Sequence, residues 1–252
     1  QKKRWEIPYK RGWKRWHYIT GLIFGVFLVW WSISGIFSMS RVPQWIVPTK
    51  AEFTFNTSRL WGKGVLPLET YQLDYRKLQD VYPDLKKVDW VRFADIPAYR
   101  IIEGENERYI DASGTEVVAL NVPQKTIEEG FRKIHGNDSK MTVTVLEKYD
   151  NYYLNLRRTL ELPVYKVEFD DDDHNLYYVN PRDGYIRYLN KNKIVDKWLF
   201  SAIHYLNMGW LVNRPWLWTF CLWFLCIGCG IVCFTGVVLG VKTWLIRKKK
   251  KS

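Results

Sequence analysis

The stretch WHYITGLIFGVFLVWWSISGIFSM, residues 16–39, has 24 consecutive positions without Asp, Glu, Lys or Arg. A second stretch, PWLWTFCLWFLCIGCGIVCFTGVVLGV at residues 215–241, has 27. At a rise of about 1.5 Å per residue, either stretch is long enough as a helix to cross about 30 Å of hydrocarbon. We therefore predict two transmembrane helices, over residues 16–40 and 214–241.

A cleaved secretory signal peptide is the alternative for the first stretch, because basic residues precede it. The stretch has about twice the apolar length of a typical signal core, and Ser38-Met39-Ser40 matches the A-x-A cleavage pattern poorly. We therefore favour a retained spanning helix.

The excess of basic residues is confined to the two tails that flank these stretches. Residues 1–15 contain seven basic residues and one acid, and residues 242–252 contain six basic residues and no acid. The tails thus account for the whole formal net charge of +12. Basic residues near spans stay on the cytoplasmic side, so both termini are predicted to be cytoplasmic, and the partner is the lipid bilayer. A protein that binds nucleic acid would spread such charge over a folded surface, so no nucleic-acid partner is expected.

All four cysteines lie in the second apolar stretch: Cys221, Cys226, Cys229 and Cys233. The segment between the spans therefore has no disulfide framework. Side chains at these spacings on a straight helix cannot converge on one iron–sulfur cluster. We expect the cysteines to pack as small apolar residues.

The segment between the spans, residues 41–195, contains one pattern twice: a helix followed by antiparallel strands. A one-sided apolar stripe (Tyr71, Tyr75, Leu78 and Tyr82) predicts a helix over residues 69–82, and a second helix is predicted over residues 124–134. The predicted strands are 88–93, 98–103, 141–147, 151–158 and 162–169, with turns at 111–114 and 180–184. The repeat indicates an extracytoplasmic α+β domain of two small sheets, each covered by a helix.

The segment DKWLFSAIHYLNMGWLV, residues 196–212, follows that domain. Its apolar residues cluster on one side of a helix, but it is too short and too polar to span a membrane. We predict an interfacial amphipathic helix over residues 196–213.

Three short blocks resemble a known family. WHYITGLIFGVFLVWWSISG (16–35) matches a W-H-x3-G-x3-G start with a closing Ser/Thr-Gly pair, FSAIHYLNMG (200–209) matches a second histidine segment, and YVNPRDGYI (178–186) is typical of a PepSY unit. Their order resembles the PepSY-associated transmembrane proteins, which include iron-regulated membrane proteins and ferric-siderophore reductases. The resemblance implies two tandem PepSY-like units in the periplasm, between two spans in the bacterial inner (cytoplasmic) membrane.

The resemblance also implies haem b as the cofactor, with electrons passing across the bilayer. His17 and His204 would be axial ligands of haem iron, and Gly21 and Gly25, on the same helix face as His17, would leave room for the flat macrocycle. The alternative is that His17 completes an interfacial aromatic belt and the glycines serve helix packing. Antiparallel spans would hold the two histidines about 30 Å apart. Each haem would then need a ligand from a homodimer partner or another membrane subunit.

The predicted function is reduction of ferric iron or a ferric chelate at the outer face, as a ferric- or siderophore-type reductase component, with electrons from quinol or a cytoplasmic donor. One alternative is a non-catalytic accessory or interaction subunit of a larger membrane complex, which the small size and the 14 tryptophans suit. A membrane-tethered modulator of proteases rests on the PepSY resemblance alone.

The other two histidines are weaker candidates. His135 closes the helix predicted over residues 124–134, so we expect a solvated residue at the helix end. His174 follows Asp170 to Asp173, and these carboxylates could hold a hard cation. The strand-like sequences on either side favour the tip of a hairpin instead.

Overall fold

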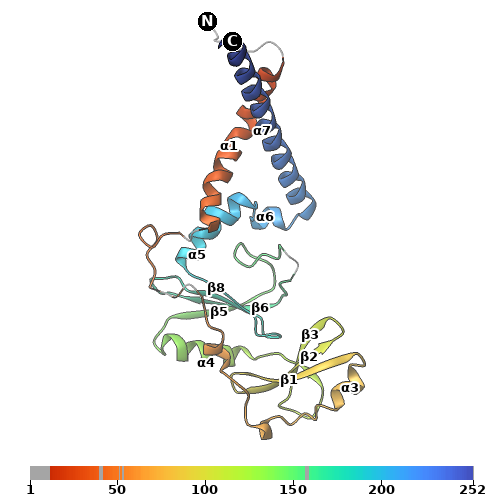
Figure 1. Cartoon of the computed structure of the whole chain (residues 1–252). Helices are drawn as coiled ribbons and strands as arrows, with labels where there is room; N and C mark the ends of the chain where they lie inside the picture. The colour runs from red at the N-terminus through yellow and green to blue at the C-terminus, as the bar shows by residue number, and fades with distance from the viewer. Residues whose placement is uncertain (1–11, 40–41, 51, 53, 157–158, 252) are drawn as a thin grey trace. The chain divides into compact units, whose positions relative to one another are not determined.

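The computed structural model describes residues 12–39, 42–50, 52, 54–156 and 159–251, which divide into two units (Figure 1). The helical unit comprises Gln1–Pro43 and Val195–Ser252, and the sheet unit comprises Gln44–Ile194. Most of the predicted N-terminal basic tail, residues 1–11, lies outside the described residues.

Two long helices, α1 (Trp13–Met39) and α7 (Pro215–Lys251), dominate the helical unit. The segments Trp13–Ser38 and Pro215–Arg247 are long and apolar enough to cross a membrane, with mean hydropathies of 1.9 and 2.5. Many large apolar side chains on both helices are exposed, among them Leu22, Val29, Ile36, Phe224 and Val237. A helix that is apolar on all sides is typical of a buried or membrane environment rather than of water.

The two long helices run antiparallel and touch along the half of α1 nearer its start (Figure 1). The ring of Phe24 lies over Gly228, where the ring would collide with any Cβ atom. The Cys229 thiol lies 3.8 Å from the carbonyl oxygen of Phe24, so this cysteine packs as the small residue that was expected. Toward the start of α1, Trp13 packs edge to face on Phe234, with ring centroids 5.9 Å apart.

The segment expected as one interfacial helix over residues 196–213 is interrupted. It consists of the end of α5 (Lys191–Asp196), a π-helical turn η2 (Lys197–Ala202) and the short helix α6 (Gly209–Val212). Between η2 and α6 the backbone reverses at Leu206, whose φ is +51°. Contacts with α1 hold this arrangement: the Trp31 indole donates a hydrogen bond of 3.4 Å to the carbonyl of Ile203. Tertiary contacts therefore override the helical period of the sequence here.

The sheet unit contains two antiparallel four-stranded sheets, each in simple meander order (Figure 1). The strands of the first sheet are β1 (Leu85–Phe93), β2 (Ile96–Glu103), β3 (Asn106–Asp111) and β4 (Val118–Ala119). Those of the second are β5 (Met141–Leu146), β6 (Val164–Phe169), β7 (Leu176–Val179) and β8 (Ile186–Leu189). The helical elements before them are α2 (Ser58–Trp61), η1 (Leu68–Thr70), α3 (Lys77–Val81) and α4 (Gln124–His135). The predicted α+β repeat of two small sheets is confirmed.

The helix α4 supplies the middle of the main core. Its buried residues Ile127 and Phe131 pack with Leu60 and Trp61 of α2 and with residues from both sheets, such as Phe93 and Val167. The outer face of the first sheet is covered by α3 and the loop before it, and that of the second by residues 149–153 and 160–162. All four residues of β7 are buried, because both faces of that strand are covered.

Two predicted elements of the sheet unit are wrong. Only residues 77–81 of the helix expected over 69–82 are α-helical, because the N–H groups of Gln72 and Leu73 both donate to the carbonyl of Ala112, at 2.8 and 3.3 Å. The strand expected over 151–158 is a loop at 151–156, where the Asp150 carboxylate accepts the N–H groups of Tyr152 and Tyr153. Residues 157–158 lie outside the described residues. The first element is replaced by hydrogen bonds to a residue distant in the sequence, and the second by local side-chain hydrogen bonds.

Candidate functional site

His17 lies in the second turn of α1 and is half-buried against α7. Its Nδ1 atom is 2.9 Å from the hydroxyl of Thr235. That hydroxyl donates its own proton to the carbonyls of Ile231 and Val232, at 2.8 and 3.0 Å. Its oxygen is therefore the acceptor, and Nδ1–H of His17 is the donor. This contact selects the tautomer whose Nε2 atom carries a free lone pair.

His204 repeats this arrangement near the other end of α1. Its Nδ1 atom is 3.1 Å from the hydroxyl of Ser34, which itself donates to the carbonyl of Trp31 at 3.1 Å. Nδ1–H is again the donor, and Nε2 again has the free lone pair. The imidazole ring is enclosed by aromatic neighbours, with Phe200 at 5.1 Å, Tyr205 at 5.2 Å and Trp31 at 6.2 Å between centroids.

The two histidines are far apart within the helical unit. His17 and Ser34, the contact of His204, are separated by about 25 Å along α1 at the helical rise of about 1.5 Å per residue. Two nitrogens at this distance cannot ligate one iron. Among the described residues, no group of three or more His, Cys, Asp or Glu side chains is placed to hold a metal ion.

The glycines expected beside His17 lie away from the contact between the long helices. A Cβ atom added at Gly21 or Gly25 meets nothing within 4 Å. Each step of four residues turns about 40° around a helix, so these positions move progressively off the face that His17 occupies. The strip of α1 at Gly21 and Gly25 is therefore open. Gly236 is different, because a Cβ there would lie 3.3 Å from Cε1 of His17.

The acidic cluster before His174 forms the tip of the β6–β7 hairpin. The sequence favoured this hairpin tip over a cation site. Asp171 accepts the backbone N–H groups of Asp173 and Asn175, at 3.2 and 3.0 Å. Asp173 accepts the backbone N–H of Lys50 at 3.0 Å and pairs with the Lys191 ammonium at 3.1 Å. These carboxylates are engaged in closing the turn.

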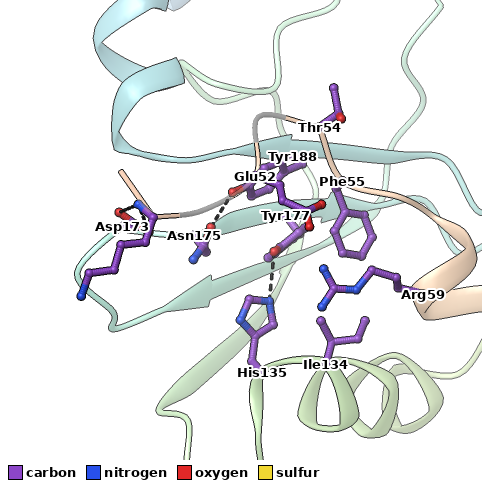
Figure 2. Close-up of a pocket in the computed structure, with 11 residues that line it drawn as sticks. Glu52, Thr54, Phe55, Arg59, Ile134, His135, Asp173, Asn175, Tyr177 and Tyr188 are labelled. Atoms are coloured by element: carbon purple, nitrogen blue, oxygen red, sulfur yellow. Dashed lines mark hydrogen bonds between the residues drawn. The ribbon is translucent and has the colours of Figure 1, made fainter. Parts of the chain in front are cut away.

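His135 is placed differently from the solvated helix end that the sequence predicts. It is half-buried, its ring stacks on Phe169 with centroids 4.1 Å apart, and its Nε2 atom is 3.0 Å from the hydroxyl of Tyr177 (Figure 2). Burial lowers the pKa of His135, so the neutral imidazole is favoured. The sequence carries one signal for this site: His135 continues the stripe of Ile127 and Phe131 at intervals of four residues.

His135 forms part of the wall of a cavity of about 260 Å³ in the sheet unit (Figure 2). Aromatic rings of Phe55, Tyr177 and Tyr188 form another part, and the charged side chains of Arg59 and Glu52 lie beside them. This cavity could not be predicted from the sequence, because its residues come from segments that are up to 138 positions apart.

Comparison with protein-family models, curated proteins and solved structures finds no match to this chain. The PepSY-type assignment is therefore a resemblance of the sequence blocks quoted above and nothing more.

Proposed function

We propose that this chain is a haem-b-binding electron-transfer protein of the bacterial inner membrane, with α1 and α7 as spans. Both basic tails would lie in the cytoplasm and the sheet unit in the periplasm. The chain would serve as the membrane part of a ferric-iron or ferric-chelate reductase, which receives electrons from quinol or a cytoplasmic donor.

The membrane assignment rests on the surface of the two long helices and on the charge of the tails. Only 17% of the apolar window in α1 and 28% of that in α7 are buried within the chain. A core helix of a soluble protein would be largely covered, whereas a lipid-facing helix leaves apolar side chains exposed to hydrocarbon. The basic residues after the apolar stretch of α7 match the cytoplasmic side of a span.

The observation that carries the haem proposal is that a hydroxyl lies at hydrogen-bond distance from Nδ1 in both His17 and His204. Histidines that ligate metals usually hold the other ring nitrogen in a hydrogen bond, which fixes the ring and raises the basicity of the ligand atom. Thr235 and Ser34 supply this contact, and each Nε2 atom has no hydrogen bond with any described residue. The donor set fits axial imidazole ligation. Haem b, when bound, supplies one-electron transfer between ferric and ferrous iron.

The distance between the histidines supports an assembly rather than a single chain. At about 25 Å along α1, each histidine would serve a different haem, one near each face of the bilayer. The second axial ligand of each would come from a homodimer partner or from another membrane subunit. The open strip at Gly21 and Gly25 leaves space beside His17 for a flat macrocycle or a neighbouring helix.

The sheet unit supports the periplasmic part of the proposal. Each sheet is an antiparallel meander preceded by helical elements, the repeat expected of two tandem PepSY-like units. Such a unit would hold the ferric substrate or a partner at the outer face.

A pyridine haemochrome spectrum of the full chain purified in detergent tests this function. We expect a b-type reduced-minus-oxidised spectrum that is lost or strongly reduced in His17→Ala and in His204→Ala. His174→Asn is the matched control, because His174 lies at a hairpin tip with φ +49°, which asparagine tolerates. A colourless, folded preparation would refute the proposal, and so would equal haem content in all four proteins.

The role of Thr235 can be tested separately. Thr235→Ser keeps an acceptor for Nδ1–H of His17, whereas Thr235→Val removes it at nearly constant volume. We expect the serine variant to keep the wild-type spectrum and the valine variant to lose haem or shift its reduction potential. Identical spectra and potentials in the two variants would show that the hydroxyl does not orient a ligand.

The second candidate, an accessory subunit without a cofactor, is supported by the same hydrogen bonds. The pairs His17–Thr235 and His204–Ser34 would then act as polar clamps between segments of the helical unit, a common role for buried polar groups in membranes. A folded, colourless chain that co-purifies with other membrane subunits at fixed stoichiometry would favour this candidate.

A further inference from the structure

The cavity beside His135 has a floor of stacked aromatic rings. Tyr177 stacks on Tyr188 with centroids 4.8 Å apart, and Phe55 meets Tyr177 edge to face at 5.0 Å. Hydrogen bonds hold two of these rings: the Tyr188 hydroxyl donates to Asn175 at 2.7 Å, and the Tyr177 hydroxyl is paired with His135. The two tyrosines are buried, with their faces covered by each other and by neighbouring side chains, so the apolar surface that the cavity presents comes from the half-buried Phe55 and Ile134.

Arg59 is the cation that faces this floor. It lies on α2, which is anchored by two buried neighbours, Leu60 and Trp61, and the guanidinium points toward the cavity (Figure 2). Its side chain forms no hydrogen bond or ion pair with any residue that the structure describes. A guanidinium beside an aromatic surface suits a carboxylate, which it can bind through two parallel hydrogen bonds.

The other charges around the cavity limit the ligand to a small negative charge. The carboxylate of Glu52 is exposed near the opening and opposes a dianion. Asp173 is paired with Lys191, and the ammonium of Lys50 is directed to Asp172 at 4.0 Å. His135, which is held neutral by burial, adds a polar contact and no second positive charge.

A smaller cleft of about 160 Å³ lies on the other side of Arg59. It is lined by Arg92 and Lys133, together with Asp95 and Glu129. Arg92 is 3.6 Å from Asp95, whereas Lys133 forms no ion pair with any of the described residues. The two basic and two acidic side chains cancel in formal charge, so this cleft leaves the positive charge of Arg59 unopposed but does not add to it.

We propose that the cavity binds a small monocarboxylate that carries a flat apolar body. The carboxylate would be held by Arg59, and the body would lie against Phe55 and Ile134, above the buried tyrosine pair. The volume of about 260 Å³ fits a single ring with its carboxylate. The site lies entirely within the sheet unit and uses neither His17 nor His204, so it does not depend on the haem proposal.

Calorimetric titration of the full chain in detergent with benzoate tests this site. Two probes separate the contributions: acetate has the charge without the body, and benzyl alcohol has the body without the charge. We expect benzoate to bind at least about 10-fold more tightly than either, because a charged, partly desolvated pair and an apolar stack each contribute. Inorganic phosphate should bind more weakly than benzoate.

The matched variants are Arg59→Gln and Arg76→Gln. Both side chains are exposed, and Arg76 pairs with Asp74 away from the cavity, so neither change should unfold the chain. Arg59→Gln is expected to weaken benzoate binding at least about 10-fold, and Arg76→Gln is expected to leave it unchanged. The proposal is overturned if benzoate gives no heat, if Arg59→Gln binds like the wild type, or if acetate or phosphate binds as tightly as benzoate.

Discussion

Replacing Gly184 by alanine tests the junction between the two halves of the sheet unit. Gly184 ends the turn between β7 and β8 with φ +69°, and its carbonyl accepts the Trp61 indole N–H at 2.8 Å. A Cβ atom at this position would lie 2.8 Å from Cδ1 of Phe93 and closer still to Cε1. Phe93 is only 5% exposed and is held between Trp61 and Tyr109, so its ring has little freedom to move away.

Two costs add in this variant. Alanine in the left-handed region costs about 1–2 kcal/mol, and overpacking a filled core costs about 1–3 kcal/mol. We expect a total loss of about 3 kcal/mol in the free energy of unfolding of the sheet unit. With a urea dependence of about 2 kcal/mol per molar, the midpoint of unfolding should fall by about 1.5 M.

Pulse proteolysis of the full chain in detergent over a urea series measures this midpoint. Gly114→Ala is the control, because Gly114 has no positive φ and a Cβ there meets nothing within 4 Å. In a Phe93→Ala background the collision is removed, and Gly184→Ala should then cost only the backbone term of about 1–2 kcal/mol. A shift below about 0.5 M for Gly184→Ala, or an equal cost in both backgrounds, would refute the reasoning.

Two further predictions concern His135 and the contact between the long helices. Burial lowers the pKa of His135 in the folded chain, so the unfolded chain binds more protons and stability is lost as the pH falls below about 6.5. Between about pH 7.5 and 5.5, the urea midpoint of unfolding should therefore fall less in His135→Gln than in the wild type. An equal fall in the two proteins would contradict this prediction. Gly228→Ala should lower the thermal midpoint in detergent by several degrees, because the Phe24 ring occupies the space of the new methyl group, whereas the open position Gly230→Ala should leave it unchanged. Equal midpoints for the two glycine variants would show that the helix contact is looser than described.

The elements that the sequence predicts correctly are those in which the local pattern of apolar residues matches the helix or strand that forms. The second predicted helix is confirmed as α4, because its stripe of Ile127 and Phe131 repeats every four residues and has a core to face. The predicted strands around β1, β2, β5 and β6 are runs rich in β-branched and aromatic residues, and all four form strands. The helix predicted over 69–82 has the same kind of stripe, yet the backbone N–H groups of Gln72 and Leu73 donate to the carbonyl of Ala112. The spacing of apolar residues does not reveal this partner.

The neighbours of the candidate site residues could not be predicted from the sequence. His17 and His204 were predicted from their sequence blocks, but the hydroxyl partners Thr235 and Ser34 lie 218 and 170 positions away and required the packing of the helical unit. The cavity at His135 could not be predicted from the sequence, because only the folded sheet unit brings Arg59 and the tyrosines close to it.

The amino-acid sequence alone determined the two apolar stretches of residues 16–39 and 215–241, the charge of their tails and the repeated α+β pattern between them. These are local properties, set by composition and by the 3.6- and 2-residue periods of helix and strand. Tertiary structure alone decided which ring nitrogen of His17 and of His204 has a hydroxyl partner, where the segment over residues 196–213 breaks at Leu206, and that His135 is half-buried. The physical reason is that a hydrogen-bond partner or a covering ring can come from any part of the chain, and only packing brings it within reach.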